Sequence, residues 1–125
     1  MSTTIEPAAR DRGGFLHPLA RPIGSVLVVP LAEELAFRGY LIRRLTSADF
    51  ESVPPGRWGW TPMLISSTVF GLLHGRWLAG TLVGVMYALA LRRRGNLGDA
   101  VLAHATTNLL IAGAVVTRGD GAMWA

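Results

Sequence analysis

Charged and polar side chains interrupt the apolar stretches of this sequence in three short clusters. The clusters are Glu33-Glu34-Leu-Ala-Phe-Arg38, Phe70-Gly-Leu-Leu-His74 and His104-Ala-Thr-Thr-Asn108. Each contains a pair of these residues at i, i+4 spacing, which places both side chains on one face of a helix. A charge among apolar groups is costly to bury, so a charged side chain in such a place is a candidate for function.

These side chains are suited to the hydrolysis of a peptide bond. A carboxylate and two imidazoles, here Glu33, His74 and His104, can deprotonate a water molecule and hold it for attack. The amide of Asn108 and an imidazole N–H can stabilise the oxyanion that develops on the peptide carbonyl. No Ser or Thr in an apolar stretch has His and acid partners nearby in sequence, so attack by water is favoured over a covalent intermediate. Nucleophilic roles stay open for Ser66, Ser67 and Thr106.

Four apolar stretches carry the clusters and predict an all-α, polytopic membrane helix bundle. They cover residues 23–45, 62–75, 78–91 and 97–117. A hydrocarbon layer of about 30 Å needs about 20 helical residues. The first and fourth stretches are long enough, whereas the second and third are expected to start or stop inside the membrane or behind other helices. Pro30 either kinks the first helix one turn before Glu33 or begins a new helix there.

Composition and charge agree with this class. Half of the 125 residues are hydrophobic, 16% are charged and the mean hydropathy is +0.38, which is high for a soluble domain. The net charge is +4, but the basic residues are all Arg and lie mostly at the ends of apolar stretches. There they are typical of topology signals, which argues against nucleic-acid binding. Because Cys is absent, there is no disulfide, thiolate metal site or Cys nucleophile.

The arginines also predict which connections share a side of the membrane. Excess Arg marks the cytoplasmic side, which groups Arg43, Arg44 and Arg57 with the run at 92–94. Three arginines of the N-terminal segment then fall on the opposite side, against the rule: Arg10, Arg12 and Arg21.

This topology places the three clusters at comparable depth. Glu33, His74 and His104 lie about 15, 18 and 10 Å from the cytoplasmic side at helical rise. We therefore expect one shared site. A stripe of Gly80, Gly84 and Ala88 along the third stretch predicts close approach of another helix.

The order Glu-Glu-x-x-x-Arg, Phe-x-x-x-His, His-x-x-x-Asn resembles the CPBP family, the CAAX-processing and bacteriocin-processing intramembrane proteases also called Abi. The motifs run from Glu33 to Asn108, which is most of the chain. The segment 70–108 further resembles a bacterial subgroup associated with exosortase systems. The resemblance implies a multi-pass protein of the bacterial inner membrane. Its substrate would be a membrane protein or a lipidated peptide, although family members usually have more spans.

Roles follow from the resemblance by position. Glu33 would be the general base that activates water, and His74 would help to orient that water. His104 and Asn108 would complete the site and stabilise the oxyanion. The supporting residues would be Glu34 and Arg38 as a buried pair, with Phe70 packed beside the site.

The need for a metal is a separate question. The resemblance covers both zinc-dependent and metal-free, glutamate-dependent proteases. Glu33, His74, His104 and Asn108 could bind zinc and leave a position for water. Zinc sites on helices often use two His at i, i+4, whereas each helix here offers one His. A metal-free site is therefore favoured.

Other functions remain open at this stage. A catalytically inactive scaffold or bacteriocin-immunity protein of the same fold would keep the polar clusters for folding, and only an enzyme needs an ionisable Glu33. A proton-coupled transporter needs a continuous polar path, and the apolar run after Asn108 does not supply one. The expected organisation is a polar tail at 1–18, a protease core at 19–118 and a C-terminal tail at 119–125.

Overall fold

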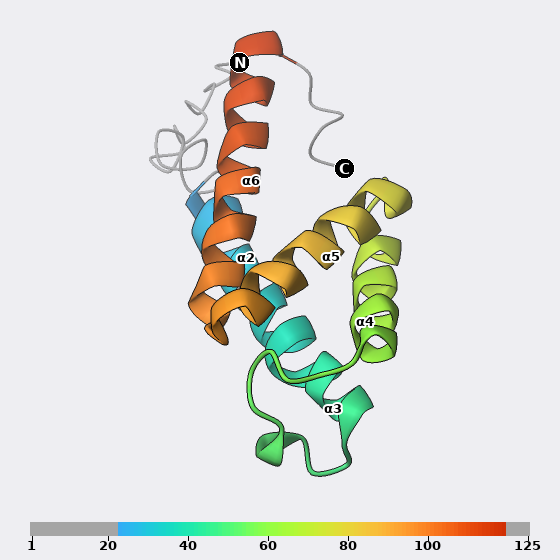
Figure 1. The fold of residues 1–125 in the computed structure, drawn as a ribbon. Coiled ribbons are helices and arrows are strands. Elements are labelled where there is room, and N and C mark those ends of the chain that lie inside the picture. The colour runs from blue at the N-terminus through green and yellow to red at the C-terminus, as the bar shows by residue number, and fades with distance from the viewer. Residues whose placement is uncertain (1–22, 120–125) are drawn as a thin grey trace, which may run out of the picture.

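The computed structural model describes residues 23–119, and this part of the chain is helical and contains no strand. The all-α prediction is therefore confirmed. The first helical run consists of η1 (Gly24–Val28), α2 (Val29–Glu34), η2 (Leu35–Leu41) and α3 (Ile42–Thr46). After the short helix η3 (Phe50–Ser52), three longer helices follow: α4 (Trp60–Leu72), α5 (Trp77–Arg94) and α6 (Leu97–Arg118) (Figure 1). The segment 1–18 and nearly all of 119–125, with Arg10, Arg12 and Arg21, lie outside the described residues.

Two π-helical turns flank α2 within the first run. The N–H of Val29 donates to the carbonyl of Gly24, five residues back, and the N–H of Ile42 likewise donates to the carbonyl of Phe37. Pro30 stands in the first turn of α2, where its missing N–H is tolerated. Pro30 thus begins a new helical segment and does not interrupt the run. Glu33 and Glu34 are the last two residues of α2, so both carboxylates lie between the π-helical stretches.

Helices α4 and α5 pack closely through glycine, as the small-residue stripe predicts. A Cβ added at Gly80 would lie 3.0 Å from the Cα of Gly71, and one added at Gly84 would lie 3.4 Å from the Cα of Ser67. Gly84 and Ala88 are buried in this contact. The absence of side chains therefore lets α4 bring Phe70 and the following turn against α5.

The turn between α5 and α6 contains the predicted helix stop. Gly95 caps α5 with a φ of 68°, and the side chain of Asn96 accepts from the N–H of Gly98 at 2.8 Å. Helix α5 runs past the apolar stretch to Arg94, because arginines are favourable at a helix C-terminus.

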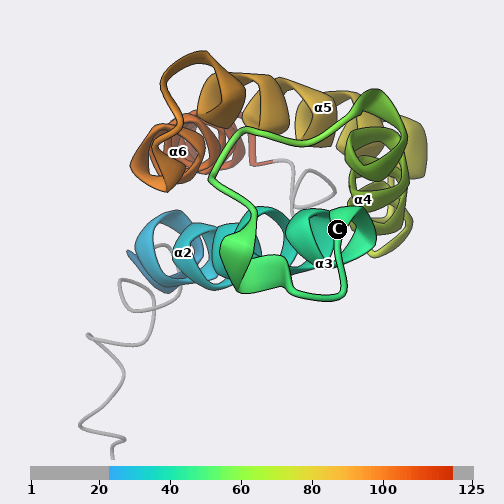
Figure 2. The same ribbon diagram turned by 60° about the horizontal axis from the view of Figure 1, so that its bottom comes forward.

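The connection before α4 lies beside this turn. A Cβ at Gly56 would meet the Cα of Arg92 at 3.1 Å. The segment around Arg57 and the run at 92–94 thus share one end of the molecule, as the arginine distribution predicts (Figures 1 and 2).

The outward faces of the helices are apolar. On α6, Leu109, Leu110 and Val116 are 58%, 70% and 82% exposed. Among the described helices, α6 is the one that is long and apolar enough to cross a membrane. Buried residues of all four helical stretches, with Trp58 from the connection before α4, form the core: Phe37, Ile42, Trp58, Met63, Phe70, Tyr87, Ala88, Leu91 and Ala100.

Candidate active site

Glu34 and Arg38 form a fully buried ion pair on the inner face of the first run. Arg38 Nη1 donates to Glu34 Oε1 at 3.2 Å, and the side chains are both 0% exposed. Arg38 Nη2 donates to the carbonyl of Gly84 at 2.5 Å, across 46 residues of sequence. The guanidinium also lies 4.7 Å from the centre of the Phe70 ring, a cation–π distance. Arg38 therefore links the first run to α4 and α5.

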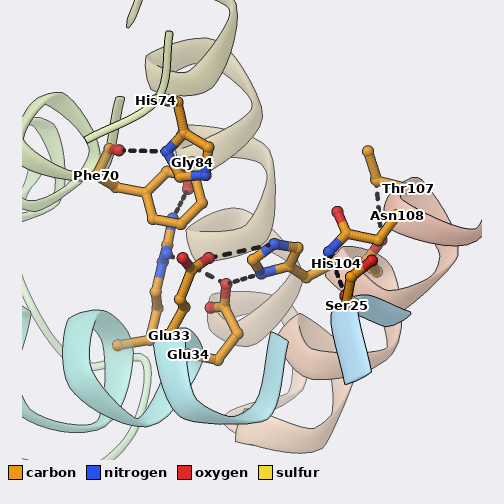
Figure 3. A network of polar contacts seen from close by, with 11 residues as sticks. Ser25, Glu33, Glu34, Phe70, His74, Gly84, His104, Thr107 and Asn108 are labelled. Atoms are coloured by element: carbon orange, nitrogen blue, oxygen red, sulfur yellow. Dashed lines mark hydrogen bonds and ion pairs between the residues drawn. The ribbon is translucent and has the colours of Figure 1, made fainter. Parts of the chain in front are cut away.

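His104 contacts both neighbouring carboxylates (Figure 3). Its Nδ1 is 2.9 Å from Glu34 Oε1, and its Nε2 is 3.5 Å from Glu33 Oε2. Because Glu34 Oε1 already accepts from Arg38, we assign the proton of His104 to Nδ1. Nε2 and the Glu33 carboxylate are both acceptors when unprotonated, so a hydrogen bond between them needs a proton on one of the two. The ring stacks on Tyr87 with centroids 4.6 Å apart and planes 18° apart.

His74 is fixed by the backbone of its own helix end. Its Nδ1 lies 2.7 Å from the carbonyl of Phe70. A carbonyl only accepts, so Nδ1 carries the proton and Nε2 of the neutral ring is left as an acceptor. The buried Phe70 ring contacts both imidazoles, with centroid distances of 4.5 Å to His74 and 5.6 Å to His104. Phe70 thus packs between His74 of its own motif and His104 of the third motif.

Asn108 ties α6 to the start of the first run. Its Nδ2 donates to the carbonyl of Ser25 at 2.7 Å, across 83 residues of sequence. Because that partner is an acceptor, the nitrogen of the amide is assigned without ambiguity. The second N–H and the Oδ1 of Asn108 make no hydrogen bond within the described residues.

All three motifs border a single cavity of about 360 Å³. Its polar lining includes the following residues: Ser25, Glu33, His74, Arg76, Tyr87, His104, Thr107 and Asn108. Glu33 Oε2 is buried and has no hydrogen-bond partner among the described residues, although the side chain as a whole is 29% exposed. Glu34 and Arg38 do not line the cavity and lie behind it. The structure therefore brings Glu33, His74, His104 and Asn108 together, as the depth argument predicts.

Some contributors to this site were not found from the sequence. Tyr87 stacks on His104 and is 3% exposed. It lies three residues after Gly84 on the close-packing face of α5, so its place on that stripe was the available signal. Ser25 and Gly84 act through backbone carbonyls, which no side-chain pattern reveals.

The zinc hypothesis concerns Glu33, His74, His104 and Asn108, which line the same cavity. The Nδ1 atoms of His74 and His104 are both engaged by protein oxygens, which leaves the Nε2 atoms as the ring nitrogens available to a ligand. Within residues 23–119, no three His, Cys, Asp or Glu side chains are grouped as ligands for a metal ion. We therefore derive no chemical step through a metal.

Ionisable side chains gathered inside helices whose outward faces are apolar are typical of a functional site within a membrane. The family model described as "Type II CAAX prenyl endopeptidase Rce1-like" matches residues 15–110. The chain belongs to this family, which confirms the resemblance to CAAX proteases. The family and the apolar helix α6 together indicate an integral membrane protein.

Similarity also extends to a protein of different name. The "Alpha-(1->3)-arabinofuranosyltransferase" of Mycobacterium tuberculosis is 35% identical over 104 residues. The alignment covers 82% of this chain but 7% of that protein, so the chain spans a small part of its curated relative. No solved structure matches the chain.

Proposed function

We propose that this chain is an intramembrane endopeptidase in which Glu33 activates the attacking water. One observation carries the proposal: Glu33 lines the cavity with a side chain that is 29% exposed, and its Oε2 lies 3.5 Å from His104 Nε2 without a hydrogen-bond partner in the described chain. A carboxylate in that position can take a proton from a water held in the cavity.

The proton balance of the reaction then runs through Glu33. Water gives one proton to the Glu33 carboxylate, and its oxygen forms a bond to the carbonyl carbon of the substrate. When the C–N bond breaks, the same proton passes to the leaving nitrogen. His104 Nε2 is close enough to share the proton while it is held, and His74 Nε2 can accept the second O–H of the water.

The oxyanion that develops on the substrate carbonyl needs a hydrogen-bond donor on the side of the cavity opposite Glu33. Among the groups that line the cavity, we propose the second N–H of Asn108 as this donor, because no described residue accepts it. Loss of one such donor typically lowers the rate by about 10²–10³-fold. The Ser25 carbonyl positions Asn108 by holding its first N–H.

Glu34 and Arg38 act on the reaction only through His104. The bond from His104 Nδ1 to Glu34 fixes both the tautomer and the plane of the ring. Arg38 in turn compensates the charge of Glu34. This places the supporting pair behind the reacting atoms, in agreement with the absence of both residues from the cavity lining.

Family membership supports a membrane-bound substrate, either a lipidated C-terminal peptide or a membrane protein. We propose that all four helical stretches lie in a bacterial inner membrane, with the connections at 47–59 and 95–96 in the cytoplasm. Single cysteines at Ser52 and Asn96 should both react with an impermeant thiol reagent only after cells are opened. Labelling of both from outside would invert this topology, and labelling on opposite faces would break the four-segment arrangement.

The proposal is tested with Glu33→Gln, which keeps the shape of the side chain but cannot accept the proton. Purified wild type and variant are incubated with prenylated peptides and with membrane-protein substrates, and new termini are read by mass spectrometry. We expect the variant to be about 10²–10⁴-fold slower. Glu51→Gln, in the exposed helix η3, is the matched control and should cleave at the wild-type rate. A Glu33→Gln variant that cleaves normally would remove Glu33 from the mechanism, and a wild type without any cleavage would favour the scaffold function.

We further propose that water activation needs no metal. Chelator-washed protein should keep its activity, as measured on the same substrates alongside elemental analysis. Stoichiometric zinc whose removal abolishes cleavage, and whose return restores it, would overturn this part of the proposal.

A further inference from the structure

A second cavity, of about 720 Å³, lies between α5 and α6. These helices diverge from the turn at residues 95–96 (Figure 1), and the cavity occupies the side of that junction that carries Met86 and Leu102. Its lining divides by chemistry. Apolar side chains line one part of the groove, and charged side chains line the part near the helix ends. The apolar residues are Met86, Ala90, Leu102 and Ala103, and the charged residues are Arg93, Arg94 and Asp99.

We propose that this groove binds an anionic phospholipid of the surrounding bilayer, with the phosphate on Arg93 and an acyl chain along the apolar wall. The inference concerns binding alone and does not rest on the proposed proteolysis.

The charges of the groove favour an anionic head group. Arg94 Nε lies 3.6 Å from Asp99 Oδ2, so its charge is partly compensated. Arg92 is directed elsewhere, with its guanidinium 5.0 Å from the centre of the Trp60 ring. Arg93 forms no hydrogen bond or ion pair within the described chain, yet it lines the groove. A guanidinium binds phosphate through two parallel N–H donors, and basic pockets between membrane helices favour anionic head groups.

The apolar part of the groove favours a lipid over a free anion. Met86 and Leu102 are 65% and 67% exposed, so an occupant must cover an apolar wall as well as meet a cation. Free phosphate satisfies only the cation. A phospholipid satisfies both, and it is present wherever α6 lies in a membrane. Trp58 and Trp60, which both lie near Arg92, are residue types that concentrate at the level of lipid head groups.

The lipid would reach the neighbourhood of the first cavity. Tyr87 and Thr107 line both cavities, and the Tyr87 ring stacks on His104. One aromatic side chain therefore separates the acyl-chain end of the groove from the imidazole of the candidate site.

The test is native mass spectrometry of the purified full chain in detergent. The chain is mixed with phosphatidylglycerol or with phosphatidylcholine of identical acyl chains, at equal concentration. We expect wild type to retain the anionic lipid preferentially. Arg93→Gln should lower that retention by roughly fivefold, the effect of one cation near a lipid head group. Arg93→Lys should keep most of it.

Two further variants separate the head-group contact from the apolar wall and from general charge. Arg118→Gln removes an arginine at the other end of α6 and should leave lipid preference unchanged. Leu102→Trp fills the groove without touching a cation and should lower retention of both lipids. Equal retention of the two lipids by wild type would overturn the proposal. So would an unchanged preference in a helical, monodisperse Arg93→Gln, or an equal loss in Arg118→Gln.

Discussion

Glu33 and Glu34 are adjacent residues at the end of one short helix, and the fold treats them in opposite ways. The Glu34 side chain is 0% exposed and accepts from both Arg38 and His104. The Glu33 side chain is 29% exposed, and its Oε2 makes no hydrogen bond within residues 23–119. Both acids have a buried Oε2 without a hydrogen-bond partner in the described chain, so they differ in two other respects: Glu34 Oε1 accepts two bonds, and Glu33 lines the cavity.

The comparison shows how a buried site can hold two acids and keep one of them available. A buried charge is retained only where partners compensate it, and Arg38 and His104 both serve Glu34. The Arg38 guanidinium donates to Glu34 and to the Gly84 carbonyl, and within the described residues no ion pair joins an arginine to Glu33. His104 contacts both acids. It therefore links the buried pair of Glu34 and Arg38 to Glu33, which lines the cavity.

The largest effect that this comparison predicts is on stability. Arg38→Ala leaves Glu34 as a buried charge without its cation, which typically costs about 3–5 kcal/mol. We expect lower yield and a lower unfolding temperature in detergent. Arg44→Ala, which removes an exposed arginine from the same run, is the control and should unfold like wild type.

A second substitution tests whether Glu34 is the cause. Glu34→Gln placed in the Arg38→Ala background should recover part of the lost stability, because the stranded charge is gone. If the double variant is no more stable than Arg38→Ala, the two side chains do not depend on each other. Glu34 is then not the buried charge that Arg38 compensates.

A smaller effect is expected where α5 meets the supporting pair. Gly84→Ala would place a Cβ 3.0 Å from Arg38 Nη2 and 3.1 Å from Phe70 Cδ1. Overpacking of this kind costs about 1–3 kcal/mol. Gly113→Ala is the matched control, because a Cβ there meets nothing within 4 Å and alanine favours a helix. Thermal unfolding should show a loss of stability in Gly84→Ala and a small gain in Gly113→Ala. A Gly84→Ala variant as stable as wild type would show that α5 does not press on Arg38.

Local parts of this architecture could be predicted from the sequence. The i, i+4 spacing gives the Glu34–Arg38 pair, because helix geometry alone brings those side chains together. Gly95 and Asn96 mark the turn between α5 and α6 through their own backbone and side-chain preferences. The small residues of α5 predict a close partner without saying which helix it is.

The remaining features depend on contacts far apart in the chain. Glu34 meets His104 across 70 residues, and Asn108 meets the Ser25 carbonyl across 83. Which of two adjacent acids becomes the buried one depends on the rotation of α2 against α6, and the π-helical turns that set this rotation carry no clear sequence signal. Family resemblance assigned the two roles, whereas the physical reason is visible only in the packed structure.

The smallest predicted effect sharpens the comparison most. Glu33→Gln should change the free energy of unfolding by no more than about 0.5 kcal/mol, the usual range for a site without a fixed partner. Glu34→Gln, the matched change one residue on, should destabilise clearly because it weakens two charge-assisted bonds and strands Arg38. Thermal unfolding of both variants in one detergent measures the difference. Equal destabilisation would mean that Glu33 is also a structural acid, and loss of cleavage in Glu33→Gln would then say nothing about chemistry. A stable Glu33→Gln variant that no longer cleaves would instead separate folding from catalysis at neighbouring positions of one helix.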